Sequence, residues 1–251
     1  MTQPEFAVLG PLALHRPGAA ASLTAPKLRN LLTLFLLADG PVPPSQVREM
    51  LDEQHRWSDQ SGPLHVAVHR LRRWLRINGG HRLVLEPGGY RLIVPPGSVD
   101  AAMFRRGYAE ARAMPDLTAK ARALQETLEL WRGPVVADAP ERLRDQYAAR
   151  QLERLRREAT VELACAGLAT GLASRALPLI ERVTETSPYD EQLHSLLALS
   201  LAACGLQGEA LAAIARTRLA LSVDLGIDPG RHLREAQDRI LRRRPTLRPV
   251  S

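Results

Sequence analysis

The feature that most constrains this chain is an amphipathic basic segment at residues 64–77. Its apolar residues recur at spacings of four, three and four, which places them in one stripe of a helix: Leu64, Val68, Leu71 and Leu75. Cationic side chains occupy the opposite side, and no acidic residue occurs between positions 59 and 86. Such a helix buries one face and presents the other to solvent or to a polyanion.

Five arginines in and after this segment have no acidic neighbour in sequence: Arg70, Arg72, Arg73, Arg76 and Arg82. A solvated helix face usually mixes charges of both signs, because unpaired like charges repel one another. Arginine also presents a planar fork of donors that fits phosphate groups and guanine edges. The cluster favours a nucleic-acid surface, and the alternative is an ordinary basic surface helix.

Two short apolar segments follow the basic helix and predict a β-hairpin. Gly79 and Gly80 end the helix, residues 81–85 and 90–94 read as strands, and residues 86–89 carry the Pro and Gly of a turn. A basic helix followed directly by a hairpin is typical of a winged helix. In that fold the wing contacts sugar-phosphate or the minor groove beside the helix.

The residues before the basic helix predict the remainder of a small DNA-binding domain. Residues 6–14 and 21–24 are candidates for short strands interrupted by Gly and Pro, and they predict a small antiparallel sheet. Helices are expected at about residues 24–40 and 45–53. With the basic helix and the hairpin, these elements predict a winged helix-turn-helix domain at residues 1–96.

Basic residues also occur where the first of these helices begins. Lys27 and Arg29 lie in its first turn, where positive charge opposes the helix dipole. An approaching phosphate would explain them, whereas surface cations without a function are equally common, so both interpretations stay open. The residues expected to contact DNA are therefore Lys27, Arg29, His65, His69, Arg70, Arg72, Arg73, Arg76, Arg82 and Arg91.

The remainder of the chain, residues 97–251, is predicted to be helical. Helices are expected at residues 101–113, 119–131, 141–168, 174–186, 189–204, 209–223 and 229–242. Four residues recur 34 positions later: Gly171, Ala176, Leu177 and Ile180 return as Gly205, Ala210, Leu211 and Ile214. This is the period of the tetratricopeptide repeat, whose stacked hairpins offer a concave surface to a protein. Chance similarity between Ala- and Leu-rich helices is the alternative.

The net charge of +7 is unevenly distributed along the chain. Residues 1–96 have a net charge of +4 and residues 97–251 a net charge of +3, and a basic tail after residue 241 supplies the excess of the second part. Polyanion binding is therefore expected in the first part.

Composition also indicates where the protein acts. Cys165 and Cys204 lie in apolar helical runs, so we expect buried free thiols in a reducing compartment. Apolar runs are too short to span a membrane, and the N-terminus has no signal-peptide pattern. A cytoplasmic protein, associated with the nucleoid when bound to DNA, is expected.

Several motifs together resemble the Streptomyces antibiotic regulatory proteins over almost the whole chain, residues 5–242. The matching stretches are residues 8–12 (VLGPL), 26–32 (PKLRNLL), 68–75 (VHRLRRWL), 89–90 (GY), 130–134 (LWRGP) and 224–230 (DLGIDPG).

The resemblance implies a mainly α protein: an N-terminal winged helix-turn-helix with a small antiparallel β-sheet and wing hairpin, then an all-α, tetratricopeptide-like bacterial transcriptional activation domain at residues 97–251. It implies a transcription activator of antibiotic biosynthesis that binds direct repeats near promoters as side-by-side protomers and recruits RNA polymerase through its sigma factor. Arg70 and Arg72 match the family's Arg-Leu-Arg pair, which contacts the groove and phosphate. Lys27 matches a lysine that touches phosphate.

Three positions depart from the family pattern. Glu86 stands where the family usually has a wing arginine, and DNA would repel this carboxylate. His69 replaces a small polar residue, and Val66 occupies an outward position that is commonly polar. The stretch after Leu51 also lacks the usual Leu-Trp-Gly. These departures concern the target sequence and the affinity rather than the fold.

Other functions receive less support from the sequence. His65 and His69 have metal-ligand spacing, but no third ligand lies near them in sequence, so no metal is expected. No Gly-rich phosphate loop or nucleophile elbow occurs, so neither enzyme activity nor a cofactor is expected. Two alternatives remain: a protein-interaction module with a degenerate winged helix, and a repressor that occludes promoters.

Overall fold

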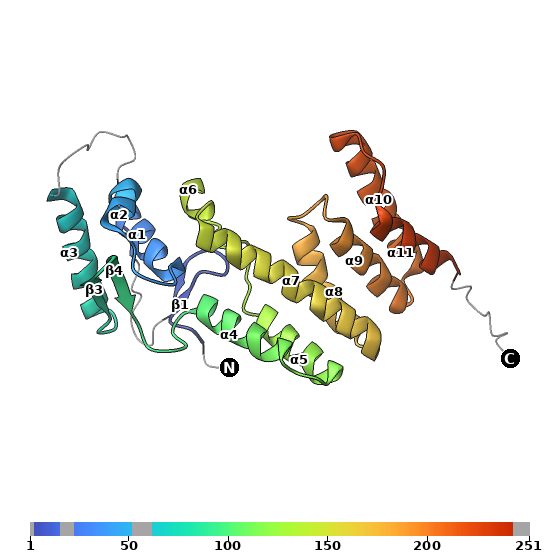
Figure 1. Ribbon diagram of the computed structural model, residues 1–251, viewed down its shortest axis with the longest axis horizontal. Helices are drawn as coiled ribbons and strands as arrows, with labels where there is room; N and C mark the ends of the chain where they lie inside the picture. Colours follow the sequence, from blue (N-terminus) through green and yellow to red (C-terminus); the bar gives the residue numbers. More distant parts are fainter. Residues whose placement is uncertain (1–2, 16–22, 52–61, 243–251) are drawn as a thin grey trace. The chain divides into compact units, whose positions relative to one another are not determined.

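The computed structural model describes residues 3–15, 23–51 and 62–242, and the chain divides into two compact units (Figure 1). The first unit comprises Met1–Arg106 and Leu130–Arg154, and the second comprises Gly107–Glu129 and Leu155–Ser251. Each unit therefore combines two separate stretches of the chain.

Three helices pack against one another in the first unit: α1 (Pro26–Leu37), α2 (Pro44–Leu51) and α3 (Gly62–Ile77). Helix α1 begins with a proline, which is well tolerated there because the first helical N–H groups have no partner within the helix. Most of α1 after its first turn is buried, so this helix forms the centre of the unit.

Helix α3 confirms the amphipathic helix predicted at residues 64–77, and it begins two residues earlier. Each residue of its apolar stripe is no more than 4% exposed: Leu64, Val68, Leu71 and Leu75. The helices predicted at residues 24–40 and 45–53 are also confirmed, the second as far as Leu51, where the described residues stop.

The predicted hairpin consists of β3 (Arg82–Glu86) and β4 (Gly89–Ile93), paired antiparallel with Leu85 opposite Tyr90. Tyr90 and Val42 exchange two backbone hydrogen bonds of 2.8 Å each, which fasten the hairpin to the connection between α1 and α2. Gly89 has a φ of +140°, and a Cβ there would lie 2.0 Å from the Val42 oxygen. Only glycine fits at this contact.

The N-terminal sheet is smaller than the sequence suggested. Strands β1 (Phe6–Ala7) and β2 (Ala13–Leu14) pair antiparallel over two residues each. The strand predicted at residues 21–24 is wrong for Leu23 and Thr24, which form no strand, and its first two residues lie outside the described ranges.

Residues far along the chain complete the first unit. Asp100, the first residue of α4 (Asp100–Arg112), accepts the backbone N–H groups of Val8 at 2.8 Å and Leu9 at 3.0 Å. The carbonyls of the same two residues accept N–H groups from Val136 at 2.9 Å and Arg132 at 2.7 Å. The backbone hydrogen-bonding groups of Val8 and Leu9 are therefore satisfied by residues about 90 to 130 positions away.

The described residues of the second unit form helices joined by turns and loops, and none of them forms a strand. The unit contains α5 (Leu117–Leu128), most of α7 (Tyr147–Thr170) and two hairpins, formed by α8 (Ala173–Thr184) with α9 (Glu191–Ala203) and by α10 (Gln207–Leu225) with α11 (Arg231–Arg242). The helix predicted at residues 141–168 is divided, because the short α6 (Glu141–Arg144) precedes α7.

The 34-residue repeat corresponds to these two hairpins, as the sequence predicted. Gly171 and Gly205 precede α8 and α10 with φ values of +75° and +85°, a conformation that favours glycine. The matched residues Ala176, Ala210, Ile180 and Ile214 are all buried. Small residues thus lie where the paired helices approach one another, and the second unit is tetratricopeptide-like.

The cysteine prediction was wrong about burial. Both thiols are free, but Cys165 is exposed and Cys204 is partly exposed. An Ala- and Leu-rich run does not by itself show which positions of a helix face the core. None of the helices in the described part of the chain is both long and apolar enough to cross a membrane.

We predict that Asp100→Ala will lower the free energy of unfolding by about 3 kcal/mol, because two buried N–H groups lose their acceptor. The side chain of Asp100 is 1% exposed, so water cannot replace it without rearrangement. The measurement is urea unfolding followed by circular dichroism.

The matched control is Asp116→Ala. Asp116 also accepts a backbone N–H at a helix start, from Ala119, but it is exposed, and its loss should cost about 1 kcal/mol. Equal effects of the two substitutions would contradict the role assigned to Asp100.

Candidate nucleic-acid interface

The outward face of α3 is cationic over most of its length. Because the apolar stripe is buried, the remaining positions of the helix face away from the core, and six predicted DNA contacts on it are exposed: His65, His69, Arg70, Arg72, Arg73 and Arg76. Among the described residues of α3 none is acidic. The basic residues expected from the sequence are therefore exposed on a helix that carries no acidic residue of its own.

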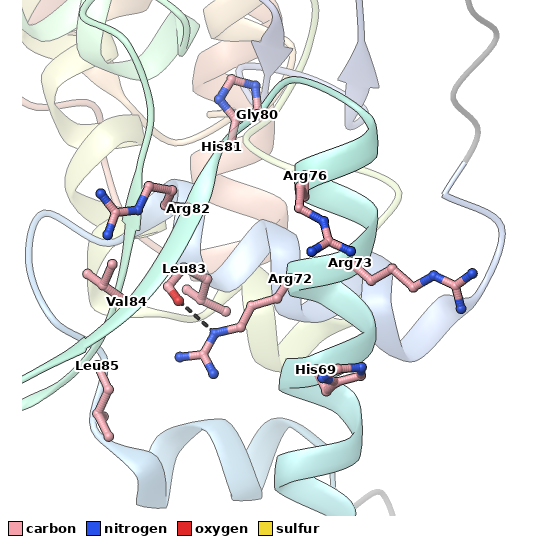
Figure 2. A pocket seen from close by; sticks show the side chains of 10 residues that line it. All are labelled: His69, Arg72, Arg73, Arg76, Gly80, His81, Arg82, Leu83, Val84 and Leu85. Atoms are coloured by element: carbon pink, nitrogen blue, oxygen red, sulfur yellow. Dashed lines mark hydrogen bonds between the residues drawn. The ribbon is translucent and has the colours of Figure 1, made fainter.

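A groove of about 720 Å³ runs between α3 and β3 (Figure 2). Its basic lining comes from Arg72, Arg73 and Arg76 on the helix and from Arg82 on the strand, and His69 of the helix also lines it. In Figure 2 Arg72 reaches from the helix toward β3, whereas Arg73 extends away from the strand. The structure thus brings five of the predicted residues to one open, positively charged groove.

Arg72 is held in place by the wing. Its Nε donates to the Leu83 carbonyl oxygen at 2.7 Å, and its guanidinium carbon lies 5.9 Å from the centre of the Tyr90 ring. These contacts fix the planar group and join α3 to both strands of the hairpin. Arg72 therefore also has a structural task that the sequence did not reveal.

Arg70 of α3 and Lys27 of α1 lie outside this groove. Both line a second hollow of about 800 Å³ whose other described lining residues are uncharged, among them Pro26, Val66 and Ala67. Arg70 and Arg72, which the family pattern treats as a pair, thus line different hollows of the same helix.

Two of the predicted contacts are engaged by acidic residues. The Arg29 guanidinium donates to the Leu12 carbonyl oxygen at 2.7 Å and forms an ion pair with Asp138. Burial alone would raise the pKa of the Asp138 carboxyl, but the Leu12 N–H and Arg29 together hold that pKa below its ordinary value. Arg29 therefore connects α1 to the segments around Leu12 and Asp138 within the first unit.

The wing contains the second such pair. Arg91 Nε lies 2.8 Å from a carboxylate oxygen of Glu86. The acidic residue that departs from the family pattern is thus neutralised by a cation on the neighbouring strand. Arg82 is exposed and lines the groove, so it is the wing cation best placed to meet a phosphate.

The two histidines of α3 do not form part of a recognisable metal centre. Among residues 3–15, 23–51 and 62–242, no group of three or more His, Cys, Asp or Glu side chains is arranged to hold a metal ion. His69 lines the cationic groove, and His65 is exposed on the same helix.

These features define a winged-helix protein with an exposed basic face on its third helix, as in regulators that bind DNA. Comparison with known proteins identifies the particular group. A family model described as the bacterial transcriptional activator domain matches residues 99–241.

Full-length similarity extends over both units. Regulatory protein AfsR of Streptomyces griseus is 33% identical over 242 residues, which cover 94% of this chain and 24% of AfsR. Transcriptional regulatory protein MoaR1 of Mycobacterium tuberculosis is 30% identical over 249 residues, covering 96% of this chain and 80% of MoaR1. The chain spans about a quarter of the length of the AfsR proteins it matches.

A solved structure supports the same assignment. Mycobacterium tuberculosis EmbR, solved in complex with a low affinity phosphopeptide, is similar with a TM-score of 0.72 at 32% sequence identity, covering 96% of this chain and 65% of EmbR. The chain therefore belongs to the Streptomyces antibiotic regulatory protein family of transcriptional regulators. The resemblance noted in the sequence is confirmed.

We predict that Arg72→Lys will loosen the wing. Lysine keeps the charge but loses the planar fork that binds Leu83. Loss of one hydrogen bond of about 1 kcal/mol should make the amides of β3 and β4 exchange with deuterium about fivefold faster.

Arg76→Lys is the matched control, since Arg76 lies one turn further along the same helix and lines the same groove. In the Arg76→Lys variant, the amides of β3 and β4 should exchange at the wild-type rate. Identical exchange in both variants would show that Arg72 does not hold the wing.

Proposed function

We propose that this protein is a sequence-specific DNA-binding transcription activator of a secondary-metabolite cluster, such as one for an antibiotic. It binds direct repeats near the promoter, with protomers side by side, and recruits RNA polymerase through its sigma factor. The observation that carries the proposal is the cationic face of α3, which continues into the groove beside the wing.

The proposed DNA surface has a centre and a periphery. At the centre, α3 enters the major groove with His65, His69, Arg70 and Arg73, while Arg72, Arg76 and Arg82 face the backbone that passes beside the wing. Lys27, in the first turn of α1, contacts a DNA phosphate. Arg29 and Arg91 contribute to DNA binding at most through their electrostatic field, because each already forms an ion pair, with Asp138 and Glu86 respectively.

The remainder of the chain is assigned to activation. Residues 1–96 would bind DNA, and residues 97–251 would form the activation domain, with helical repeats that offer a surface to the transcription machinery. The family model and the names of AfsR and MoaR1 support this regulatory role rather than a catalytic one. Such a protein acts in the cytoplasm, on the nucleoid.

The test is a selection of bound fragments from a genomic library at two salt concentrations. Wild type should enrich a directly repeated motif, and about six neutralised phosphates imply a log-log salt slope near −5. Arg70→Ala should weaken specific binding by about 1 to 3 kcal/mol and relax the preference at one base position.

The control for this substitution is Arg234→Ala, which removes the same charge from an exposed position of α11. It should leave both the motif and the salt slope unchanged. No enriched motif at either salt would favour the protein-interaction module with a degenerate winged helix. Transcription with purified polymerase then separates activation from repression by occlusion.

The ion pair in the wing generates a further prediction. Glu86→Gln removes the carboxylate that engages Arg91, so Arg91 becomes available to a phosphate. DNA affinity should rise, and the salt slope should steepen by about one unit.

The double variant Glu86→Gln, Arg91→Gln is the control. It has the same net charge in the wing as wild type, because it lacks both the Glu86 carboxylate and the Arg91 guanidinium. Its salt slope should match that of wild type. Equal slopes for the single and double variants would mean that Arg91 does not reach the DNA backbone.

A further inference from the structure

An exposed valine interrupts the cationic face of α3. Val66 is 53% exposed, although removing an apolar side chain from water is energetically favourable. Val66, Arg70 and Arg73 follow one another at spacings of four and three residues, so they form one outward line on the helix. The apolar side chain therefore lies on the same line as two of the proposed base contacts.

The surroundings of Val66 are apolar as well. Val66, Ala67 and Pro63 of α3 face Pro26 and Leu28 of α1 across the second hollow, and none of the described residues that line it is acidic. Two basic residues, Arg70 and Lys27, lie at the same hollow. A group that fits here needs an apolar part beside Val66 and a polar or negative part within reach of Arg70.

The major groove of DNA offers one apolar group at the base edges, the 5-methyl group of thymine. A guanine beside it presents the two acceptors that a guanidinium binds. We infer that Val66 contacts a thymine methyl next to the base read by Arg70, and so determines specificity at that position. The inference rests on the proposed function, because it requires α3 to lie in the major groove.

A second exposed apolar residue on the same helix provides a comparison. Ile77 is 65% exposed, but it is the last residue of α3. In helices that dock this way, the residues near the N-terminus reach the base edges. Val66 is in the N-terminal part of α3, and Ile77 lies outside the expected reading positions.

The experiment uses the full chain and the DNA motif enriched by wild type. Each thymine in turn is replaced by uracil, which removes only the 5-methyl group. At one position wild type should bind the uracil duplex about fourfold more weakly, the effect of one buried methyl. Val66→Ala should bind the thymine and uracil duplexes equally at that position, and Ile77→Ala should behave as wild type.

A separate readout distinguishes this inference from the proposed function. None of these variants changes the charge, so all should keep the wild-type salt slope. Circular dichroism verifies that Val66→Ala is folded, and Val66→Thr, which retains one methyl group, should keep part of the discrimination.

Two results would overturn the inference. If uracil weakens wild type and Val66→Ala equally at every position, Val66 reads no methyl group, while the proposed function stands. If wild type enriches no DNA motif at all, the proposed function fails and the inference fails with it.

Discussion

The burial of four apolar side chains on α3 is the constraint on which the proposed interface depends. Leu64, Val68, Leu71 and Leu75 fix the rotation of the helix about its own axis, because turning it by one residue would move the stripe by about 100°. Such a rotation would bury an arginine with no acidic partner on the helix, at a cost of several kcal/mol. The hydrophobic stripe therefore determines which side chains face outward, and the cationic surface is its consequence.

Ion pairing divides the arginines that were predicted to contact DNA into two groups. Arg29 and Arg91 are matched by Asp138 and Glu86, so their charges stabilise the protein and contribute little to the field outside it. The arginines of α3 have no acidic residue on their own helix. In the proposed interface, a polyanion is therefore attracted more strongly to the arginines of α3 than to Arg29 or Arg91.

The sequence predicted the elements whose signals are local. The spacing of apolar residues defined α3 to within two residues, and the Gly and Pro residues defined the hairpin around its turn. The 34-residue recurrence identified the two helical hairpins of the second unit. The break between α6 and α7 was missed, since periodicity continues across it.

The sequence could not predict contacts between distant residues. Arg29 and Asp138 are 109 positions apart, and no local pattern relates them. The hydrogen bond from Arg72 to Leu83 crosses from the helix to a backbone carbonyl, which carries no residue-specific signal. For this reason the candidate residues were recognised as a group, while their division into structural and exposed cations required the fold.

The discontinuous first unit has a consequence for exchanging parts among regulators of this family. The segment that precedes α4 and the segment around Asp138 are joined by side-chain and backbone hydrogen bonds. A chimaera that exchanges parts between two relatives has to carry both segments together, or the hydrogen bonds between them are lost. Recombination at a single crossover between these segments would therefore yield few folded regulators, whereas substitutions on the exposed face of α3 leave these hydrogen bonds intact.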